Sequence, residues 1–272
     1  MSRIRLVTFD ILHTLIVPRQ PIHVQYAEVF KPYLGALKPD DVKSSFKAAL
    51  KAVQKELPAY QHGAPAWWSE VIKRTALGAG ADPQRLSSSL DAIVPTLLHR
   101  FSSREGYKAF PDAIPTILAL QNSGVQVGII SNGDSRFSEM NSYLQTGKEL
   151  IFAQGSVLQD LGFPQTVNPV ALSEEVGMEK PDRAIFDWTL RKYNSDHPNE
   201  RVDPGSCLHV GDELECDFHG ATQAGFHAVL LRRPGPEGEQ AHKEEGEELK
   251  SVRVIQGLQE VHDIVCSRDG HV

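Results

Sequence analysis

The clearest pattern along the chain is a series of short runs rich in apolar and β-branched residues, separated by longer segments with helical periodicity. The four runs are IRLVTFD (4–10), VQVGIIS (125–131), SCLHVGD (206–212) and FHAVLL (226–231). Continuous apolar strands that alternate with helices are typical of a parallel sheet with both faces covered. The pattern therefore predicts an α/β fold.

Three of these runs end in polar residues. The first ends in Asp10, the second in Ser131, and the third in the pair Gly211 and Asp212. In an open parallel sheet, ligands bind at the carboxyl ends of the strands. We therefore expect these side chains to meet at one edge of the sheet and to form a functional site there.

More than a hundred residues separate the first run from the second, which is too long for a single crossover. From Asp40, a predicted N-cap, apolar residues recur at helical spacing, and residues 66–77 and 89–101 repeat the pattern. This pattern predicts a helical domain inserted over residues 17–107. The core then consists of residues 1–16 and 108–272.

Two adjacent tryptophans, Trp67 and Trp68, lie in the inserted segment. We expect them to pack the inserted helices together, with a substrate-facing position for one of them as the alternative. Within the core, residues 112–124 are predicted to form a helix and residues 252–255 a short strand. Residues 234–250 are rich in Pro, Gly and Glu, and they predict a solvated, flexible acidic loop.

Composition and charge exclude several classes of protein. The 272 residues carry a net charge of -7, so nothing indicates binding to nucleic acid, and we interpret Arg232 and Arg233 as solvated surface. No apolar run approaches the ~20 residues of a membrane-spanning helix, and the N-terminal residues lack the apolar region of a signal peptide. The three cysteines include no CxxC pair. We expect a soluble protein of the cytoplasm, the nucleus or both that is not secreted.

Each candidate motif is weak by itself. Asp10 and Ser131 could each be a helix N-cap, and a single lysine such as Lys180 in EKPD (179–182) usually lies on the surface. The fourth motif, HVGDELECD (209–217), places Asp217 five residues after the aspartate that ends the strand. The order of the four motifs along the chain is more informative than any one of them.

In this order the motifs resemble the four motifs of the haloacid dehalogenase (HAD) superfamily of hydrolases. The resemblance covers nearly the whole chain and is most specific over residues 173–186 and 209–231. It implies a Rossmann-like α/β core with an inserted α-helical cap of the C1 type. It also implies a hydrolase that acts on a small phosphorylated molecule or another small substrate, with no nucleic-acid or membrane partner.

The resemblance further implies a Mg²⁺ site around a nucleophile. Asp10 would attack phosphorus and form an aspartyl intermediate. Asp10, Asp212 and the main-chain carbonyl of Leu12 would bind Mg²⁺, and Asp217 would support the metal directly or through water. Oxygen ligands suit this hard cation.

Four residues would form the phosphoryl-binding part of the site in this interpretation. Ser131 and the backbone amide of Asn132 would contact its oxygens, while Thr14 would hold the loop behind the nucleophile. Lys180 would neutralise charge on both the nucleophile and the phosphate, which otherwise repel each other.

One position departs from the family pattern. Family phosphatases carry a second aspartate two residues after the nucleophile, as general acid and base, and this chain has Leu12 there. Acid–base catalysis contributes on the order of 10²–10⁴ in rate, so hydrolysis of alkyl phosphates should be slow. His13 is adjacent and titrates in a suitable range, but in an extended segment its side chain would point the opposite way.

Several functions stay open at this point. We favour a Mg²⁺-dependent, phosphatase-like enzyme with weak turnover, and the first alternative is a phosphate- and Mg²⁺-binding protein without turnover. Haloacid dehalogenases need no acid, but Asp212 and Asp217 keep the metal-binding form. Phosphonatases use a cap lysine, and no single lysine stands out here. Residues 142–154 look like an insertion relative to the family, and we interpret them as a surface loop without function.

Overall fold

The computed structural model describes residues 3–57, 60, 63–134, 157–235 and 246–266. The chain divides into two compact units. The first, here called the sheet unit, consists of Met1–Val17, Ala109–Gly133 and Gly162–Val272. The second, the helical unit, consists of Pro18–Lys108 and Asp134–Leu161. Two of the crossings between the units lie in short strands that pair with each other, β2 (Ile16–Pro18) and β3 (Tyr107–Ala109).

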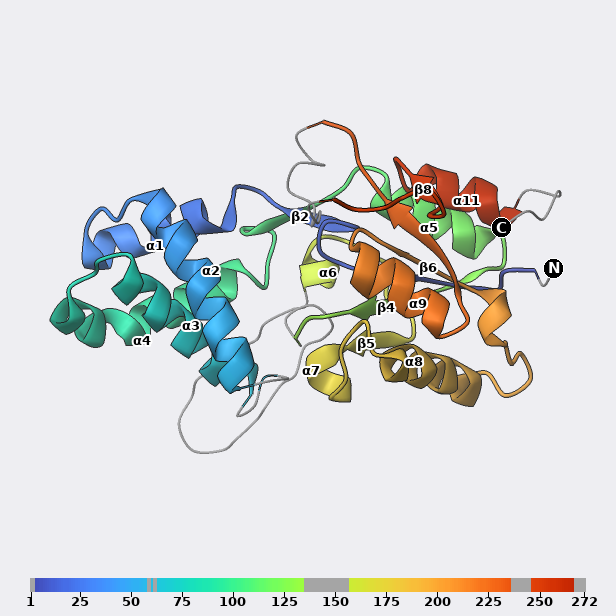
Figure 1. Cartoon of the computed structure of the whole chain (residues 1–272), viewed down its shortest axis with the longest axis horizontal. Coiled ribbons are helices and arrows are strands. Elements are labelled where there is room, and N and C mark those ends of the chain that lie inside the picture. The colour runs from blue at the N-terminus through green and yellow to red at the C-terminus, as the bar shows by residue number, and fades with distance from the viewer. Residues whose placement is uncertain (1–2, 58–59, 61–62, 135–156, 236–245, 267–272) are drawn as a thin grey trace. The chain divides into compact units, whose positions relative to one another are not determined.

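The sheet unit is built on six strands in the order β5-β4-β1-β6-β7-β8, and every paired strand is parallel to its neighbour (Figure 1). This arrangement confirms the predicted α/β fold, and the four predicted runs form β1, β4, β6 and β7. The strands are β1 (Leu6–Phe9), β4 (Gln126–Ser131), β5 (Val170–Leu172), β6 (Cys207–Gly211), β7 (His227–Leu231) and β8 (Val254–Ile255). The short strand predicted at residues 252–255 forms β8, whereas the sequence did not indicate β5.

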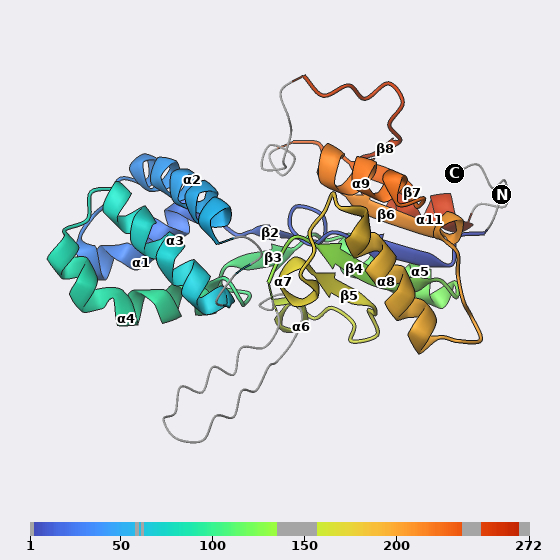
Figure 2. The ribbon, with the colours of Figure 1, turned by 60° about the horizontal axis from the view of Figure 1, so that its bottom comes forward.

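Helices cover both faces of this sheet, as its continuous apolar strands require (Figure 2). One face carries α5 and α11, and the other carries α8 and α9. Buried side chains of α8, including Phe186 and Tyr193, pack in one cluster with Leu6 of β1 and Cys207 of β6. The helical segments are α5 (Ala113–Asn122), α7 (Ser173–Val176), α8 (Arg183–Asp196), η2 (Pro204–Ser206), the π-helical turn η3 (Leu214–His219), α9 (Gly220–Gln223) and α11 (Gln259–Cys266).

The described residues of the helical unit include four longer α-helices and one short one. They are α1 (Ile22–Leu34), α2 (Pro39–Glu56), α3 (Ala64–Gly78), α4 (Pro83–Arg100) and α6 (Val157–Asp160). The predicted N-cap at Asp40 is wrong, since Lys38 takes the cap position and Pro39 begins the helix. Proline is favoured at the first helical position, and Asp40 then lies in the first turn, where its charge is still favourable. None of the described helices has the length and apolar character needed to cross a membrane.

The two tryptophans occupy different environments within the helical unit. Trp67 is buried against Val53 and Val71, and its indole nitrogen donates to the carbonyl of Leu57 at 2.9 Å. Its expected packing role is confirmed. The ring of Trp68 contacts the ring of Trp67, and its indole nitrogen donates to Oδ2 of Asp134 at 2.7 Å.

Two predicted segments lie wholly or partly outside the described residues. The proposed insertion at 142–154 lies outside the described residues. Of the predicted acidic loop at 234–250, the described portions contain neither helix nor strand.

Candidate active site

The register of the sheet brings the predicted site residues to one edge. Phe9 at the end of β1 pairs with Ile129 of β4 on one side and with Val210 of β6 on the other. Just beyond these pairs lie Asp10 after β1, Ser131 at the end of β4, and Gly211 and Asp212 at the end of β6 and just after it. Asp10, Ser131 and Asp212 are all buried there.

Lys180 connects the nucleophile candidate with the fourth motif. Its Nζ lies 2.7 Å from Oδ1 of Asp10 and 2.6 Å from Oδ1 of Asp217, with all three side chains buried. Ser131 Oγ also donates to Oδ1 of Asp10, at 2.8 Å. One oxygen of Asp10 is therefore held by two donors. Its other oxygen, Oδ2, accepts no hydrogen bond from the part of the chain that the structure describes.

The segment after Asp10 is a tight turn. Main-chain bonds run from His13 N to the carbonyl of Ile16 at 2.7 Å and from Leu15 N to the carbonyl of Ile11 at 2.8 Å. His13 adopts a left-handed backbone, with φ of 62°. The expectation that His13 points away from the site assumed an extended segment, and that assumption is wrong, because side chains alternate only along an extended backbone.

Leu12 and Thr14 lie in the same turn. Leu12 is half-buried and has no ionisable group, as the sequence already showed. Thr14 is buried, and its hydroxyl donates to Oδ1 of Asp212 at 3.4 Å, a long hydrogen bond that connects the first motif with the fourth. The roles of the Leu12 carbonyl toward a metal and of Thr14 toward a substrate stay predictions.

Asn132 positions Lys180. Its side-chain nitrogen donates to the carbonyl of Lys180 at 2.8 Å, and its side-chain oxygen accepts the amide of Lys180 at 2.7 Å. This pair of bonds fixes the backbone that carries the lysine. The sequence interpretation gave Asn132 only a backbone role, so this contribution of its side chain is an addition.

Asp217 is held in place by its own turn and by β6. Its Oδ2 accepts the amide of Glu213 at 2.9 Å, and its Oδ1 lies 3.1 Å from Nε2 of His209. A side chain at Gly211 would collide with the carboxylate of Asp217. Glycine at the end of β6 therefore allows this carboxylate to approach the strand closely.

His209 is a site residue that the sequence interpretation missed. It is buried in β6 between Asp217 and Thr8, whose hydroxyl lies 2.9 Å from Nδ1. Burial lowers its pKa, which favours the neutral ring. Asp217 accepts from Nε2–H, so Nδ1 accepts from the Thr8 hydroxyl. A histidine in an otherwise apolar central strand could have marked this position.

The charges of the site shift each other's pKa values. Burial, reinforced by the carboxylates of Asp217 and Asp212, raises the pKa of Asp10 to about 7 despite the nearby Lys180. Burial alone would raise the pKa of Asp217, but Lys180 and His209 outweigh it and lower that pKa. Burial would likewise lower the pKa of Lys180, and Asp10 and Asp217 together raise it. In the absence of a metal ion, the carboxylates of the site carry more negative charge than the single ammonium of Lys180 balances.

The residues present fit a divalent cation. Ligand oxygens of Asp10, Asp212 and Asp217 all lie within 4.8 Å of one another. Three carboxylates and one ammonium leave two negative charges, which a divalent cation would neutralise. Carboxylate oxygens are also the ligands that Mg²⁺ accepts.

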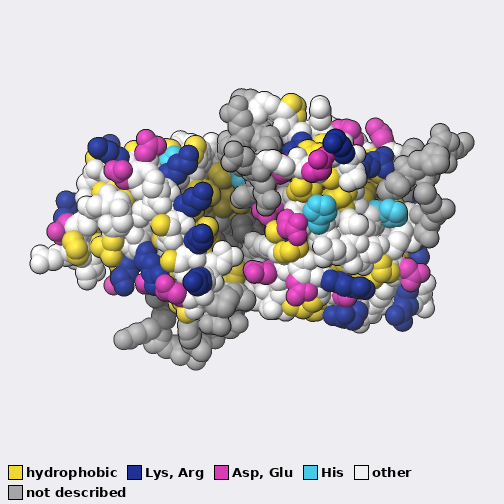
Figure 3. Space-filling model, in the orientation of Figure 1, with side chains coloured by type: hydrophobic (Ala, Val, Ile, Leu, Met, Phe, Trp, Pro, Cys, Tyr) yellow, Lys and Arg dark blue, Asp and Glu magenta, His cyan; other side chains and the backbone are white. Residues whose placement is uncertain are grey.

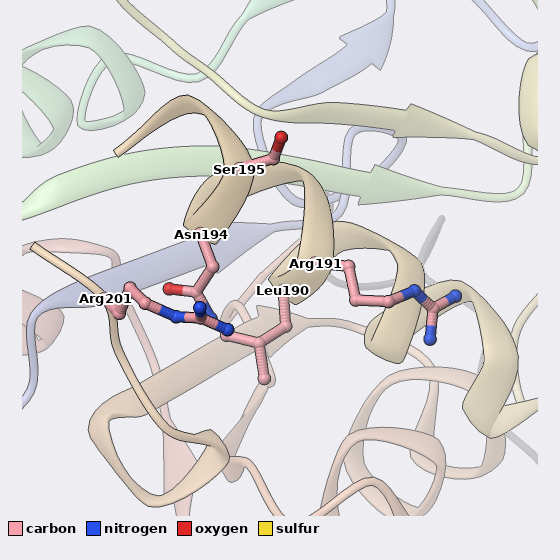
Figure 4. Close-up of a pocket in the computed structure, with 5 residues that line it drawn as sticks. All are labelled: Leu190, Arg191, Asn194, Ser195 and Arg201. Carbon is pink, nitrogen blue, oxygen red and sulfur yellow. The ribbon is translucent and has the colours of Figure 1, made fainter. Parts of the chain in front are cut away.

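A cavity of about 320 Å³ lies elsewhere in the sheet unit. It is lined by Leu190, Arg191, Asn194, Ser195 and Arg201. Arg191 and the hydroxyl of Ser195 point away from the other lining side chains (Figure 4). Asn194 is committed to both main-chain groups of Val202. None of the residues that converge around Asp10 contributes to this cavity.

Several curated proteins are similar to this chain in sequence. Haloacid dehalogenase-like hydrolase domain-containing protein 3 of Homo sapiens is 27% identical over 236 residues, which cover 85% of this chain and 83% of that protein. The same protein of Bos taurus is 26% identical over 238 residues, or 86% of this chain and 84% of that protein. Glyceraldehyde 3-phosphate phosphatase of Methanopyrus kandleri is 27% identical over 183 residues, or 67% of this chain and 65% of that protein.

Solved structures share the fold. A 2-haloacid dehalogenase from Pseudomonas syringae has a TM-score of 0.60 at 23% identity, covering 95% of this chain and 96% of its own. The Bacillus subtilis protein YfnB, solved bound to magnesium, has a TM-score of 0.63 at 17% identity, covering 97% and 99%. A family profile for haloacid dehalogenase-like hydrolases matches residues 4–225. This chain therefore belongs to the haloacid dehalogenase-like hydrolases.

Proposed function

We propose that this protein is a Mg²⁺-dependent, phosphatase-like hydrolase that works through an aspartyl-phosphate on Asp10, with weak turnover. The observation that carries the proposal is the buried contact of Lys180 with both Asp10 and Asp217. Such a lysine can neutralise an anionic nucleophile and an anionic substrate together. The phosphatase among the relatives gives further support for this class of reaction.

In the first step, an oxygen of Asp10 would attack phosphorus while the bond from phosphorus to the leaving oxygen breaks. The hydroxyl of Ser131 and the ammonium of Lys180 hold Oδ1, so Oδ2 is the oxygen available for attack. In the second step, water would attack the phosphorus, which releases inorganic phosphate and restores the carboxylate.

Asp10, Asp212 and Asp217, together with the Leu12 carbonyl, would bind Mg²⁺. When bound, Mg²⁺ would neutralise charge on the phosphoryl oxygens. We expect the substrate to be a small phosphorylated molecule in the cytoplasm or the nucleus. We propose that the helical unit serves as the cap, which in this interpretation selects that molecule.

Leu12 limits both steps that need proton transfer. Its side chain can neither protonate an alkoxide leaving group nor activate the water that clears the intermediate. This substitution favours one alternative function, a protein that binds Mg²⁺ and phosphate without turnover. Metal-independent dehalogenation, another alternative, accounts less well for the acidic pair Asp212 and Asp217, which lies next to Asp10.

A rapid-mixing assay with p-nitrophenyl phosphate and Mg²⁺ tests the proposal, because this leaving group departs without protonation. We expect a burst of nitrophenolate close to one equivalent, followed by slow turnover limited by Leu12. Asp10→Asn and wild type with EDTA should show no burst. If wild type shows neither burst nor turnover and still binds Mg²⁺ and phosphate, the binding-protein alternative replaces the enzyme. Turnover of a haloacid that persists in EDTA would instead establish dehalogenation.

A further inference from the structure

Two adjacent arginines follow β7, and neither is the solvated surface residue that the sequence suggested. The side chains of Arg232 and Arg233 are each only 10% exposed. The surface interpretation is therefore wrong. It relied on the average behaviour of charged pairs in an acidic chain, whereas here each guanidinium has a largely buried carboxylate as its partner.

Arg232 contacts the loop of the fourth motif. Its Nη1 donates to the main-chain carbonyl of Asp212, the residue proposed to bind the metal. Its Nη2 lies 2.6 Å and 2.7 Å from the two carboxylate oxygens of Glu247, whose side chain is 9% exposed. The carboxylate balances the buried charge and fixes the direction of the guanidinium.

Arg233 contacts the loop of the first motif. Its Nη2 donates to the main-chain carbonyl of Thr14 at 3.2 Å. Two further bonds, of 2.9 Å and 2.8 Å, join it to the carboxylate of Asp112. The guanidinium carbon lies 3.8 Å from the ring centre of Phe110, and Asp112 also accepts the amide of Leu258 at 2.9 Å. This arginine is therefore fixed from several directions.

We propose that Arg232 and Arg233 are paired positioning residues that set the separation of the two metal-binding loops. Successive side chains at the end of a strand point to opposite sides, so one dipeptide can reach both loops. Arg232 donates to the main-chain carbonyl of Asp212, which is itself a proposed ligand. Arg233 donates to the main-chain carbonyl of Thr14, which lies four residues after the proposed ligand Asp10. Neither arginine is a ligand or contacts a reacting atom.

The physical reason is preorganisation. Mg²⁺ demands near-ideal octahedral geometry, so a change in the separation of the Asp10 and Asp212 loops weakens binding. Lysine cannot replace either arginine fully, because it lacks the planar fork that contacts a carboxylate and a carbonyl at once. The inference rests on the proposed function only for the presence of Mg²⁺ at Asp10 and Asp212.

The test uses Arg232→Met and Arg233→Met, which keep the length and apolar stem of the side chain. The matched control is Arg191→Met, at an exposed arginine of α8 outside the site. Mg²⁺ affinity of the full-length proteins is measured by calorimetry, and thermal unfolding in EDTA shows whether each variant is folded. We expect the Kd for Mg²⁺ to rise about tenfold or more in either variant, with Arg191→Met unchanged. In steady-state assays, the Mg²⁺ concentration that gives a half-maximal rate should rise by a larger factor than the factor by which kcat at saturating Mg²⁺ falls.

Arg232→Lys and Arg233→Lys serve as second variants if a methionine variant does not fold, and we expect affinities between wild type and the methionine variants. Folded variants that bind Mg²⁺ as tightly as wild type would overturn the positioning role and leave the proposed function intact. Wild type that binds no Mg²⁺ would overturn both. Weakened binding in the variants, combined with the absence of a burst in wild type, would support the positioning role and reject the enzyme.

Discussion

Both units of the molecule contain a cation that contacts two carboxylates, in opposite environments. In the sheet unit, Lys180 is 2% exposed and lies 2.7 Å from Asp10 and 2.6 Å from Asp217. In the helical unit, Arg74 is 33% exposed and lies 2.8 Å from both Glu56 and Glu70. The distances are nearly the same, so the contacts alone do not distinguish a site from a surface.

Burial distinguishes them. Water screens the Arg74 cluster, and exposed ion pairs of this kind contribute little to stability. The surface in Figure 3 carries many such charges, with both signs interspersed. Burial has removed water from the charged groups of the Lys180 cluster, and this desolvation costs free energy. Apolar residues of similar size in the same place would not carry that cost. A buried cluster of charges with perturbed pKa values is therefore an indicator of function.

The largest effect should follow from Lys180→Gln. Removing the ammonium leaves Asp10 and Asp217 buried without a positively charged partner. We therefore expect the free energy of unfolding in EDTA to fall by about 3–5 kcal/mol. The burst rate with p-nitrophenyl phosphate should fall by about 10³ or more, because the anionic nucleophile and substrate then repel each other. Urea unfolding and rapid mixing measure the two effects. Unchanged stability and rate would show that this cluster resembles the exposed one.

The sequence predicted the sheet well, because four of its strands are apolar runs that end at the same edge. It also placed Asp10, Ser131 and Asp212 correctly at that edge, since the ends of parallel strands meet there. Lys180 was different, because a lysine before a proline normally indicates surface. Only the order of all four motifs, and the family resemblance that it carries, placed this lysine near Asp10, 170 positions away in the sequence.

Contacts that no local pattern records were not predicted. The hydrogen bond from the side chain of Asn132 to the backbone of Lys180 joins residues 48 positions apart in the sequence. The ion pair between Arg233 and Asp112 joins residues 121 positions apart. His209 showed a local signal, a polar residue in a buried strand, but not which carboxylate it would contact. Pairings of this kind depend on the folded topology, which is why the sequence identified the principal residues and missed their supports.

The next effect concerns pH and metal binding. The raised pKa of Asp10, about 7, means that the metal-free folded protein holds a proton there between about pH 4 and 7, where the unfolded chain has released it. The contribution of Asp10 to the free energy of unfolding in EDTA therefore falls as pH rises through this range. Mg²⁺ must displace the same proton, so its affinity should be about 100-fold weaker at pH 5 than at pH 8.

Calorimetry in two buffers with different ionisation enthalpies measures this proton directly. Wild type at pH 6 should release about one proton for each Mg²⁺ bound. Asp10→Asn should bind more weakly, with most of the pH dependence gone. Affinity in wild type that does not change between pH 5 and pH 8 would contradict the assignment of the proton to Asp10.

A smaller effect is expected from His13→Asn. Asparagine tolerates the left-handed backbone of this position, so the substitution removes the imidazole and keeps the turn. If the site truly lacks a general acid, steady-state turnover of an alkyl phosphate should stay within about twofold of wild type. A loss of tenfold or more, with the p-nitrophenyl phosphate burst preserved, would identify His13 as the proton donor and would make the buried site more complete than Leu12 suggests.

The smallest effect should come from Arg74→Gln, the counterpart of Lys180→Gln in the exposed cluster. Glu56 and Glu70 regain full hydration when the arginine is removed, so no buried charge is left without a partner. We expect the melting temperature to change by no more than about 2 °C, with less effect at high salt. The burst amplitude and Mg²⁺ affinity should equal those of wild type. A large loss of stability here would mean that burial does not separate the two clusters, and the contrast drawn for Lys180 would lose its basis.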